Sequence, residues 1–435
     1  MTKVIVVGSG SAGATAAREL ARSGADVLVL EAGASFRPFM RNLTWTVPFR
    51  RMGLLFDVRV LGLLFRHLKI SKTPEGLIRV RGYATGGCTS ISYGCLVRAE
   101  EGFERIGLDL SPEFEELERE IGPTFVPRDQ WRPMTRELFD AAERMGLSPQ
   151  RMPKLVDLER CIACGLCGVG CKTGAKWDAR RFLDQAVEAG AYLRLKSPVT
   201  RLLLRNDRVE GVEVRGSLGR ERVEGDAVLL AAGALGTASI LQASGFSQQG
   251  GAWGDIVLTL GGSFPGALAH QEIPMTWYAP RPGYILSPYI DWLAHFFHKP
   301  WRSVPIQNRV GLMIKLADQA DGRLDSKGIL HKAVTQQDQS RFQEALAEAE
   351  RLFREAGVQG DLVAGLHSAG HWGGTVPLSK EDVSTMHPGF LPDNLWVGDL
   401  SLVPQAQGLP TLLTAASLGL KTARSMMNSG RWLNG

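Results

Sequence analysis

The chain opens with a short apolar segment, a glycine-rich turn and a run of small residues. Residues 3–7 read Lys-Val-Ile-Val-Val, and residues 26–31 read Asp-Val-Leu-Val-Leu-Glu. Continuous apolar runs of this length are typical of strands buried in a parallel sheet. Between them, residues 14–22 combine alanines with polar residues, which predicts a helix. The N-terminal segment is therefore predicted to form a strand, a helix and a second strand.

Four later segments extend this pattern. Residues 226–232 predict another apolar strand, which a glycine follows. Helices are predicted at residues 176–193, 334–356 and 411–428. The second of these helices is amphipathic, and Thr335 or Asp338 would cap its N-terminus. Strands that alternate with helices predict the α/β fold class.

The turn after the first strand has the sequence Gly8-Ser-Gly10-Ser-Ala-Gly13. Gly8 would make the tight turn, Gly10 would let the backbone approach a pyrophosphate, and Gly13 would let the helix pack closely on the strand. The helix N-terminus would supply amides and a positive dipole to the phosphate. Glu31 ends the second strand, where an acid can bind ribose hydroxyls. The segment predicts a dinucleotide site.

Composition is that of an ordinary globular protein. The 435 residues are 44% hydrophobic and 22% charged, and the net charge is +5. This length predicts two or three domains. No block of like charges supports nucleic-acid binding. The chain enters a strand directly after Met-Thr-Lys and has no long apolar run, so neither a signal peptide nor a membrane span is expected.

Four of the six cysteines form a compact run. They are Cys161, Cys164, Cys167 and Cys171. Their spacing, C-x2-C-x2-C-x3-C, matches the ligand run of bacterial ferredoxins, although Lys172 stands where proline is usual. Thiolates this close repel one another unless a metal neutralises them. The run predicts an iron–sulfur cluster and one-electron transfer, with a zinc site or a small disulfide knot as alternatives.

The ligand set and nuclearity of such a cluster stay open. Cys171 could close a 4Fe-4S cluster, Cys88 or Cys95 could complete the set instead, or the cluster could be 3Fe-4S. Taken alone, Cys88 and Cys95 are expected to be small buried hydrophobes. Six cysteines without a secretory signal indicate a reducing compartment, so a cytoplasmic location is expected.

Several motifs together resemble the glucose–methanol–choline (GMC) flavoprotein oxidoreductases. They are the glycine turn at 8–13, Ala231-Ala232-Gly233-Ala-Leu-Gly-Thr, Gly86-Gly87-Cys88-Thr89-Ser90-Ile-Ser92, His371-Trp-Gly-Gly-Thr and Asn394-Leu-Trp-Val-Gly-Asp399. Ser92 stands where the family has asparagine. Residues 161–176 are similar to a segment of the iron–sulfur-containing branch, which includes the catalytic subunits of fructose dehydrogenase and FAD-glucose dehydrogenase.

The resemblance implies tightly bound FAD in a Rossmann-like domain with an inserted, reduced α+β substrate domain. Residues 1–110, 195–255 and 385–435 would form the discontinuous FAD-binding domain. Residues 111–194 and 256–384 would form the substrate or cap domain, which includes the cysteine run. His371 would be the catalytic base at the flavin, or the partner of that base. The residues implied to bind FAD are Gly8, Gly10, Gly13, Glu31, Gly86, Gly87, Thr89, Ser92, Ala232, Gly233 and Asp399.

One position departs from the family pattern. The family usually has a second His or Asn in the segment that corresponds to residues 407–414, where this chain has Leu409 and Pro410. Neither side chain can hydrogen-bond a substrate hydroxyl. His367 would be a substitute if it shared a helical face with His371, four residues later, and the alternative is a loop histidine with no role.

Two functions are consistent with these motifs. In the first, an FAD-dependent dehydrogenase oxidises the CH–OH group of an alcohol or sugar-like substrate by hydride transfer, and electrons leave through the cluster to a quinone, cytochrome or ferredoxin. In the second, the chain is a flavin and iron–sulfur electron-transfer or reductase subunit of a larger complex, without alcohol oxidation. Both functions imply an electron-acceptor protein or a partner subunit.

Two further apolar segments, residues 43–70 and 283–301, mix aromatic and basic residues. They would suit peripheral contact with a membrane surface or a partner subunit. The alternative is a lid or a substrate channel buried within the monomer.

Overall fold

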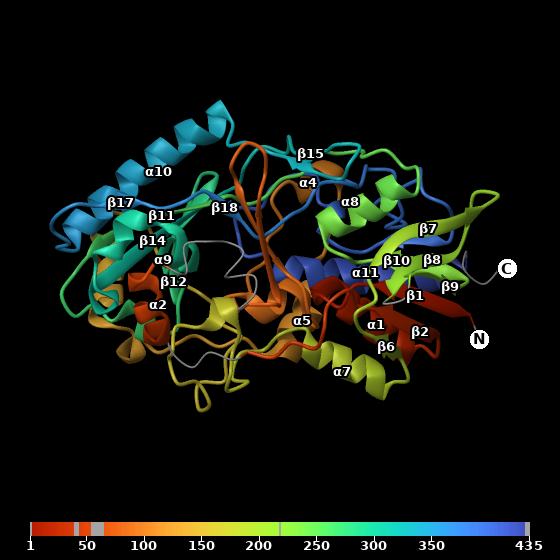
Figure 1. The fold of residues 1–435 in the computed structure, drawn as a ribbon, viewed down its shortest axis with the longest axis horizontal. Coiled ribbons are helices and arrows are strands. Elements are labelled where there is room, and N and C mark those ends of the chain that lie inside the picture. Colours follow the sequence, from red (N-terminus) through yellow and green to blue (C-terminus); the bar gives the residue numbers. More distant parts are fainter. Residues whose placement is uncertain (1, 39–42, 54–64, 217–218, 431–435) are drawn as a thin grey trace.

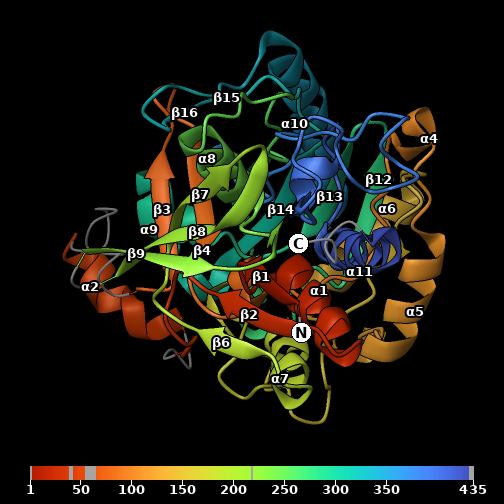
Figure 2. The ribbon, with the colours of Figure 1, turned by 90° about the vertical axis from the view of Figure 1, so that its right-hand side faces the viewer.

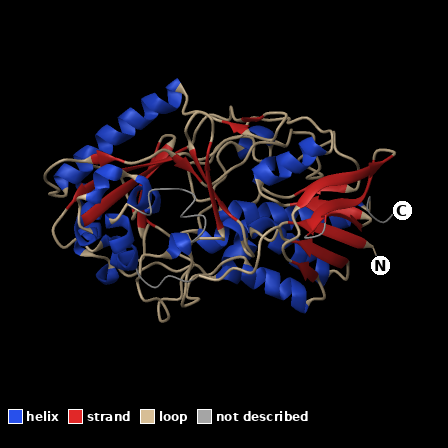
Figure 3. Cartoon of the chain, in the orientation of Figure 1, coloured by secondary structure: helices blue, strands red, loops and turns tan. Residues whose placement is uncertain are grey.

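A computed structural model describes residues 2–38, 43–53, 65–216 and 219–430. Most of its strands lie in two groups along the long axis, and helices pack on both groups (Figure 3). One group contains a five-stranded parallel sheet, and the other is a larger mixed sheet. Each of these two sheets has its own hydrophobic core. This arrangement confirms the predicted α/β fold class.

The parallel sheet takes its strands from segments far apart in the sequence. In spatial order they are β19 (Leu395–Val397), β10 (Ala227–Leu230), β1 (Lys3–Val7), β2 (Asp26–Leu30) and β6 (Tyr192–Arg194). All adjacent pairs run parallel. The central strands β1 and β10 are buried on both faces, which explains why their sequences are unbroken apolar runs.

Helices and a small sheet cover the parallel sheet. Helix α1 (Ser11–Arg22) packs against α11 (Leu412–Ser429) and α7 (Arg180–Glu188), as Figure 2 shows from the end of the molecule. Helices α1 and α11 are in close contact at Gly419, where a Cβ would lie 2.2 Å from the carbonyl oxygen of Ala12. The small antiparallel sheet comprises β7 (Val199–Arg205), β8 (Arg208–Gly216) and β9 (Gly219–Glu224), and α8 (Ala234–Ala243) packs on β7.

The mixed sheet forms the opposite end of the molecule (Figure 1). In order its strands are β3 (Leu68–Lys72), β4 (Ile78–Gly82), β18 (Ser368–Ala369), β11 (Val257–Ser263), β14 (Arg309–Leu316), β13 (Tyr284–Pro288), β12 (Trp277–Arg281) and β5 (Gln150–Arg151), with β17 (Val363–Ala364) also paired to β11. The pair β4–β18 is parallel, and the other pairs are antiparallel. Helix α10 (Gln336–Glu355) packs on β11 and β14 and on α6 (Pro133–Arg144).

The other α-helices and strands complete the fold. They are helices α2 (Val47–Arg51), α4 (Phe103–Ile106), α5 (Ser111–Ile121) and α9 (Trp292–Phe297), and a hairpin of β15 (Arg323–Leu324) and β16 (Leu330–His331). Among the described residues, no helix is both long and apolar enough to cross a bilayer.

Most predicted elements are present, with one clear correction. Helix α10 is capped by Thr335 in a capping box with Asp338, and α11 matches the predicted C-terminal helix. The helix predicted at residues 176–193 is shorter, since α7 spans only Arg180–Glu188. Its expected first turn is extended instead, because Lys176 pairs with Val156 and the amide of Trp177 donates to Leu155 O. The predicted domain boundaries stay a prediction.

The two aromatic and basic segments have different outcomes. Residues 54–64 of the first segment lie outside the described residues. The second segment, 283–301, forms the sheet strand β13 and helix α9, and Ile285, Leu286, Ile290 and Trp301 are buried in it. These four residues are part of the interior, as the lid or channel alternative predicts, and contact of the segment with a membrane or a partner stays a prediction.

Candidate functional site

The glycine turn closes tightly at its ends and is open in its middle. Gly8 has φ +106°, and a Cβ there would lie 2.3 Å from Ala231 O. A Cβ on Gly13 would lie 2.1 Å from Gly8 O, so both positions require glycine. Gly10 is different, because the nearest atom to its Cβ position is Gly87 Cα at 4.0 Å. Helix α1 begins there without a capping side chain, which leaves its first amides for a phosphate.

Glu31 lies beneath this turn at the carboxyl end of β2. Its carboxylate is 6% exposed and accepts hydrogen bonds from Ser9 Oγ at 2.6 Å, from Ser9 N at 3.1 Å and from Gly33 N at 2.7 Å. A carboxylate has about four lone-pair sites, so three donors leave acceptor capacity for a ribose hydroxyl. The position at the end of β2 suits the predicted role.

The predicted flavin loop, residues 86–92, approaches the glycine turn directly. A Cβ on Gly87 would lie 3.0 Å from Gly10 Cα, and Gly86 has φ +81°. Thr89 is buried: its hydroxyl donates to Gly86 O at 2.6 Å and accepts from Ala179 N at 3.0 Å. Ser92 Oγ donates to Thr89 O at 3.0 Å. These contacts hold the loop in a fixed shape beside the turn.

Asp399 and the Ala232–Gly233 turn complete this edge of the parallel sheet. Gly233 follows β10 and precedes α8, with φ +72° and open space where a Cβ would be. Asp399 follows β19 and is buried. Its carboxylate accepts from Thr237 Oγ1 at 2.7 Å and from Ser401 N at 2.9 Å, and burial raises its pKa. The predicted FAD-binding residues thus gather at the carboxyl ends of the strands, where parallel sheets bind ligands, and they fit this cofactor.

A cavity of about 220 Å³ lies next to the flavin loop. Most of its wall is apolar, and it includes Leu68, Ile70, Val80, Val257, Met275, Met313 and Leu412. Its polar wall comes from Ser92, His371, Asp255, Lys315, Tyr289 and Asp291. Residues of the mixed sheet, the flavin loop and the C-terminal segment therefore enclose one space, with few polar groups in it.

His371 lines this cavity beside a buried ion pair. Its Nδ1 lies 3.5 Å from Asp255 Oδ2, and the side chain is 34% exposed. Burial, and then the charge of Lys315, lower the pKa of His371, while Asp255 acts in the opposite direction. The imidazole is therefore neutral near pH 7 and can accept a proton.

Asp255 and Lys315 form that ion pair. Lys315 Nζ lies 2.5 Å from Asp255 Oδ2, and both side chains are almost fully buried. Burial acts to raise the pKa of Asp255, but Lys315 and His371 outweigh it and the pKa is lowered. Asp255 has φ +46°, an uncommon conformation for a residue other than glycine and one that often marks a functional site.

The four cysteines of the run line a second, small cavity together with Glu272 and Lys176. All four thiols are free. Cys171 Sγ accepts from Lys176 N at 3.4 Å, the kind of contact that stabilises a cluster sulfur. Four thiols on one cavity are a donor set suited to iron or zinc. In the described ranges, however, no three His, Cys, Asp or Glu side chains are arranged to hold a metal ion, so the cluster stays a prediction.

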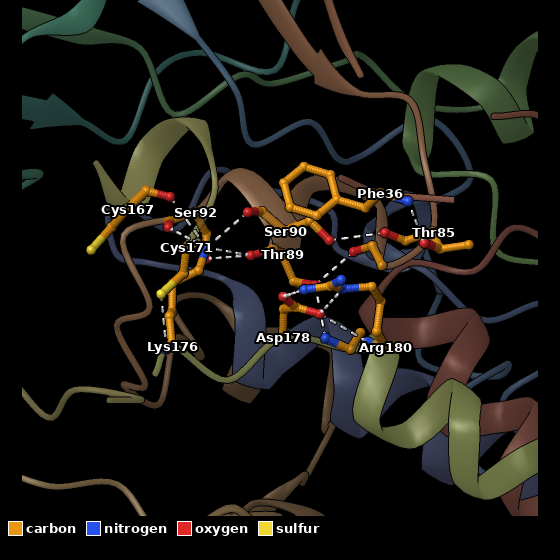
Figure 4. A network of polar contacts seen from close by, with 12 residues as sticks. Phe36, Thr85, Thr89, Ser90, Ser92, Cys167, Cys171, Lys176, Asp178 and Arg180 are labelled. Atoms are coloured by element: carbon orange, nitrogen blue, oxygen red, sulfur yellow. Dashed lines mark hydrogen bonds and ion pairs between the residues drawn. The ribbon is translucent and has the colours of Figure 1, made fainter. Parts of the chain in front are cut away.

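The buried ammonium of Lys176 joins the cysteine run to the flavin loop (Figure 4). Its Nζ donates to three carbonyl oxygens of the flavin loop, those of Thr89, Ser90 and Ser92, at 2.7–3.0 Å. It also lies 3.3 Å from Cys167 O. The Lys176 side chain therefore links the two segments.

The other two cysteines do not join the run. Cys95 is buried as expected, with Lys154 Nζ 3.1 Å from its sulfur. Cys88 is exposed, which corrects the expectation of a buried hydrophobe. It lies in the flavin loop, which follows the surface of the large cavity, and both Cys88 and Cys95 line that cavity.

His367 is not the substitute partner that its spacing suggested. Residues 368–369 form strand β18, so the two histidines do not share a helix. The His367 ring packs edge-on against Phe342 of α10, at 5.0 Å between ring centroids. Asp255 and Lys315 are the polar neighbours of His371, and sequence reasoning missed both. The one available signal was a single charged residue within the apolar run 310–316.

Comparisons with known proteins agree with this arrangement. Residues 2–254 match the sequence pattern of the GMC oxidoreductase family. An uncharacterized GMC-type oxidoreductase of Mycobacterium tuberculosis is 32% identical over 256 residues, which cover 55% of this chain and 39% of that one. A long-chain-alcohol oxidase of Arabidopsis thaliana is 29% identical over 270 residues, 56% of this chain and 34% of that one. The matched region thus spans about two fifths or less of these curated relatives.

A solved structure extends the likeness to the whole fold. Pyridoxine 4-oxidase from Mesorbium loti matches 98% of this chain and 99% of its own, with a TM-score of 0.71 and 15% sequence identity. At this identity the likeness concerns the fold alone. The family match covers more than half of the chain. The chain therefore belongs to the GMC oxidoreductases, a family of FAD-dependent oxidoreductases.

Proposed function

We propose that the chain is an FAD-dependent dehydrogenase that oxidises the CH–OH group of an apolar alcohol in the 220 Å³ cavity. GMC oxidoreductases oxidise alcohol-type substrates with FAD. The observation that carries the proposal is the position of His371 on the wall of this cavity, which the predicted flavin loop also borders through Ser92. When bound, FAD supplies the acceptor for a hydride from the substrate carbon.

The residues of the chain bind and deprotonate the alcohol. His371 accepts the hydroxyl proton. Asp255 near Nδ1 favours the tautomer that carries its proton on Nδ1, so that Nε2 is the proton acceptor. Apolar walls exclude water from the reacting group. A sugar would bring several hydroxyls that this wall cannot pair, at a cost for each unpaired group. The cavity therefore favours an alkyl alcohol over a sugar, in line with the similarity to the long-chain-alcohol oxidase of Arabidopsis thaliana.

An iron–sulfur cluster held by Cys161, Cys164, Cys167 and Cys171 is the second part of the proposal. Three observations support it: the ferredoxin-like spacing, the shared cavity of the four thiols and the Lys176 contacts to the flavin loop. When bound, such a cluster passes single electrons, which an acceptor protein or a quinone would receive. Iron and sulfide analysis of anaerobically purified protein tests this part, and stoichiometric zinc without iron would contradict it.

The oxidation itself is tested by reduction of the flavin. Protein purified with FAD is mixed anaerobically with 1-alkanols of increasing chain length and with glucose and fructose, and the loss of flavin absorbance is followed by stopped flow. We expect rapid bleaching by medium or long alkanols and little by the sugars. If no alcohol or sugar reduces the flavin, the competing function, an electron-transfer or reductase subunit, replaces this proposal.

A further inference from the structure

The cavity lacks a side chain where the family has its second polar group. Leu409 and Pro410 occupy that position, and Pro410 lines the cavity. A site that removes a hydroxyl proton next to an apolar wall needs another group to hold the oxygen as negative charge develops on it. The structure brings an ammonium from a distant strand to this place.

Lys315 reaches the segment from the centre of the mixed sheet. It belongs to β14, whose residues are all buried. Its Nζ donates to Leu409 O at 2.9 Å and to Asp255 Oδ2 at 2.5 Å. An ammonium has three protons, and these are the two partners found for it in the described part of the chain. Because Lys315 also lines the cavity, the third proton is available to a group inside it.

Asp255 connects Lys315 to the rest of the site. One carboxylate oxygen accepts from Gln407 N at 3.0 Å and from Gly408 N at 2.8 Å. The other contacts Lys315 and lies 3.5 Å from His371 Nδ1. A single buried carboxylate therefore fixes the 407–410 segment, the ammonium and the imidazole relative to one another.

We propose, on the basis of the proposed alcohol oxidation, that Lys315 replaces the missing polar side chain and donates a hydrogen bond to the substrate oxygen. His371 takes the hydroxyl proton, and FAD, when bound, would supply the acceptor for the carbon-bound hydrogen and its electron pair. Lys315 stays protonated throughout and stabilises the oxygen as its charge grows. Asp255 is a positioning residue that holds Lys315 and His371.

A second buried lysine offers a control that distinguishes a role of Lys315 in the reaction from a role in stabilising the fold. Lys332 and Asp318 form a second buried ion pair, with Lys332 Nζ 2.9 Å from Asp318 Oδ2 and both side chains 0% exposed. Asp318 accepts from Gly254 N, next to Asp255. Lys332 is not among the residues that line the cavity. Lys315→Met and Lys332→Met each remove one buried ammonium, but only the first removes a donor from the cavity.

The first readout is the limiting rate of flavin reduction by an alkanol. Removal of a donor to a developing oxyanion costs about 10²–10³-fold in rate. We expect this loss in Lys315→Met with FAD still bound, a partial recovery in Lys315→Arg, and a rate near wild type in Lys332→Met. A Lys315→Met rate within about fivefold of wild type, below that range, overturns the proposal. If Lys315→Met does not fold, Lys315→Leu, which also lacks a donor, is measured by the same criterion.

The second readout does not depend on turnover. Octanoate carries a negative charge where 1-octanol carries its hydroxyl, so the ammonium should bind it through a charge-assisted hydrogen bond. Loss of this hydrogen bond in Lys315→Met should raise the Kd of octanoate about 10- to 150-fold, and that of 1-octanol less, about 2- to 10-fold. Equal Kd values of octanoate for wild type and Lys315→Met overturn the proposal. If wild type shows this preference but oxidises no alcohol, the proposed oxidation fails while the Lys315 site stands.

Discussion

Gly10→Ala should separate FAD binding from folding. The new Cβ meets no protein atom closer than Gly87 Cα at 4.0 Å, and Gly10 has φ −71°, which alanine adopts freely. Alanine is a somewhat poorer N-cap than glycine, but it also loses less chain entropy on folding, so the two effects on stability offset to within about 0.5 kcal/mol. The apo protein should therefore melt at nearly the wild-type temperature.

The cost appears when the cofactor binds. The methyl group occupies the space between Gly10 and Gly87 through which a pyrophosphate would approach α1. Overpacking of this kind costs about 1–3 kcal/mol, equivalent to an about 5- to 150-fold higher Kd. Titration of apo protein with FAD, followed by quenching of flavin fluorescence, measures the change.

Gly13→Ala is the matched control. Its Cβ would lie 2.1 Å from Gly8 O, a backbone atom, so the helix and turn must move apart and the apo protein should melt at a lower temperature. The reasoning fails if Gly10→Ala binds FAD with the wild-type Kd, or if its apo form is destabilised as much as that of Gly13→Ala.

Three further predictions concern the catalytic and cysteine sites. His371→Ala should slow flavin reduction about 10²–10⁴-fold with FAD retained, and a loss below about tenfold in stopped flow would make the residue structural. Because burial lowers the pKa of His371, the reduction rate should be flat near neutral pH and should fall only below the usual histidine range, as the imidazole becomes protonated; a fall centred above about pH 6.5 would contradict this. Cys164→Ser should abolish iron binding and slow transfer to the acceptor while leaving reduction by substrate intact, whereas Cys88→Ser should retain iron.

Local features of the site could be predicted from the sequence, whereas contacts between distant segments could not. The Gly8–Gly13 turn could be predicted because its glycine spacing is a local pattern, and the close approach of Gly13 to Gly8 O lies within the turn itself. The pairing of Asp255 with Lys315 depends on the register of β11 against β14, which places Val257 opposite Lys315. Nothing near either residue in the sequence specifies that register.

The start of α7 illustrates the same limit. Helical periodicity continues back to Lys176, yet the ammonium of Lys176 hydrogen-bonds to the carbonyl oxygens of the flavin loop, and its backbone pairs with Val156. Tertiary contacts thus override the helical preference of the first turn. The cysteine run was evident from spacing alone, but spacing does not determine where each sulfur points.

The order of strands in the parallel sheet has a consequence for synthesis on the ribosome. Strand β1 is synthesised before the mixed sheet, whereas β19 and Asp399 follow only after the last strand of that sheet, which ends at residue 369. During synthesis from the N- to the C-terminus, the mixed sheet can therefore assemble before β19 and Asp399 complete the predicted FAD-binding edge of the parallel sheet. Until residues 395–399 emerge, the nascent chain lacks one wall of that edge, so cofactor capture must be a late event in its maturation.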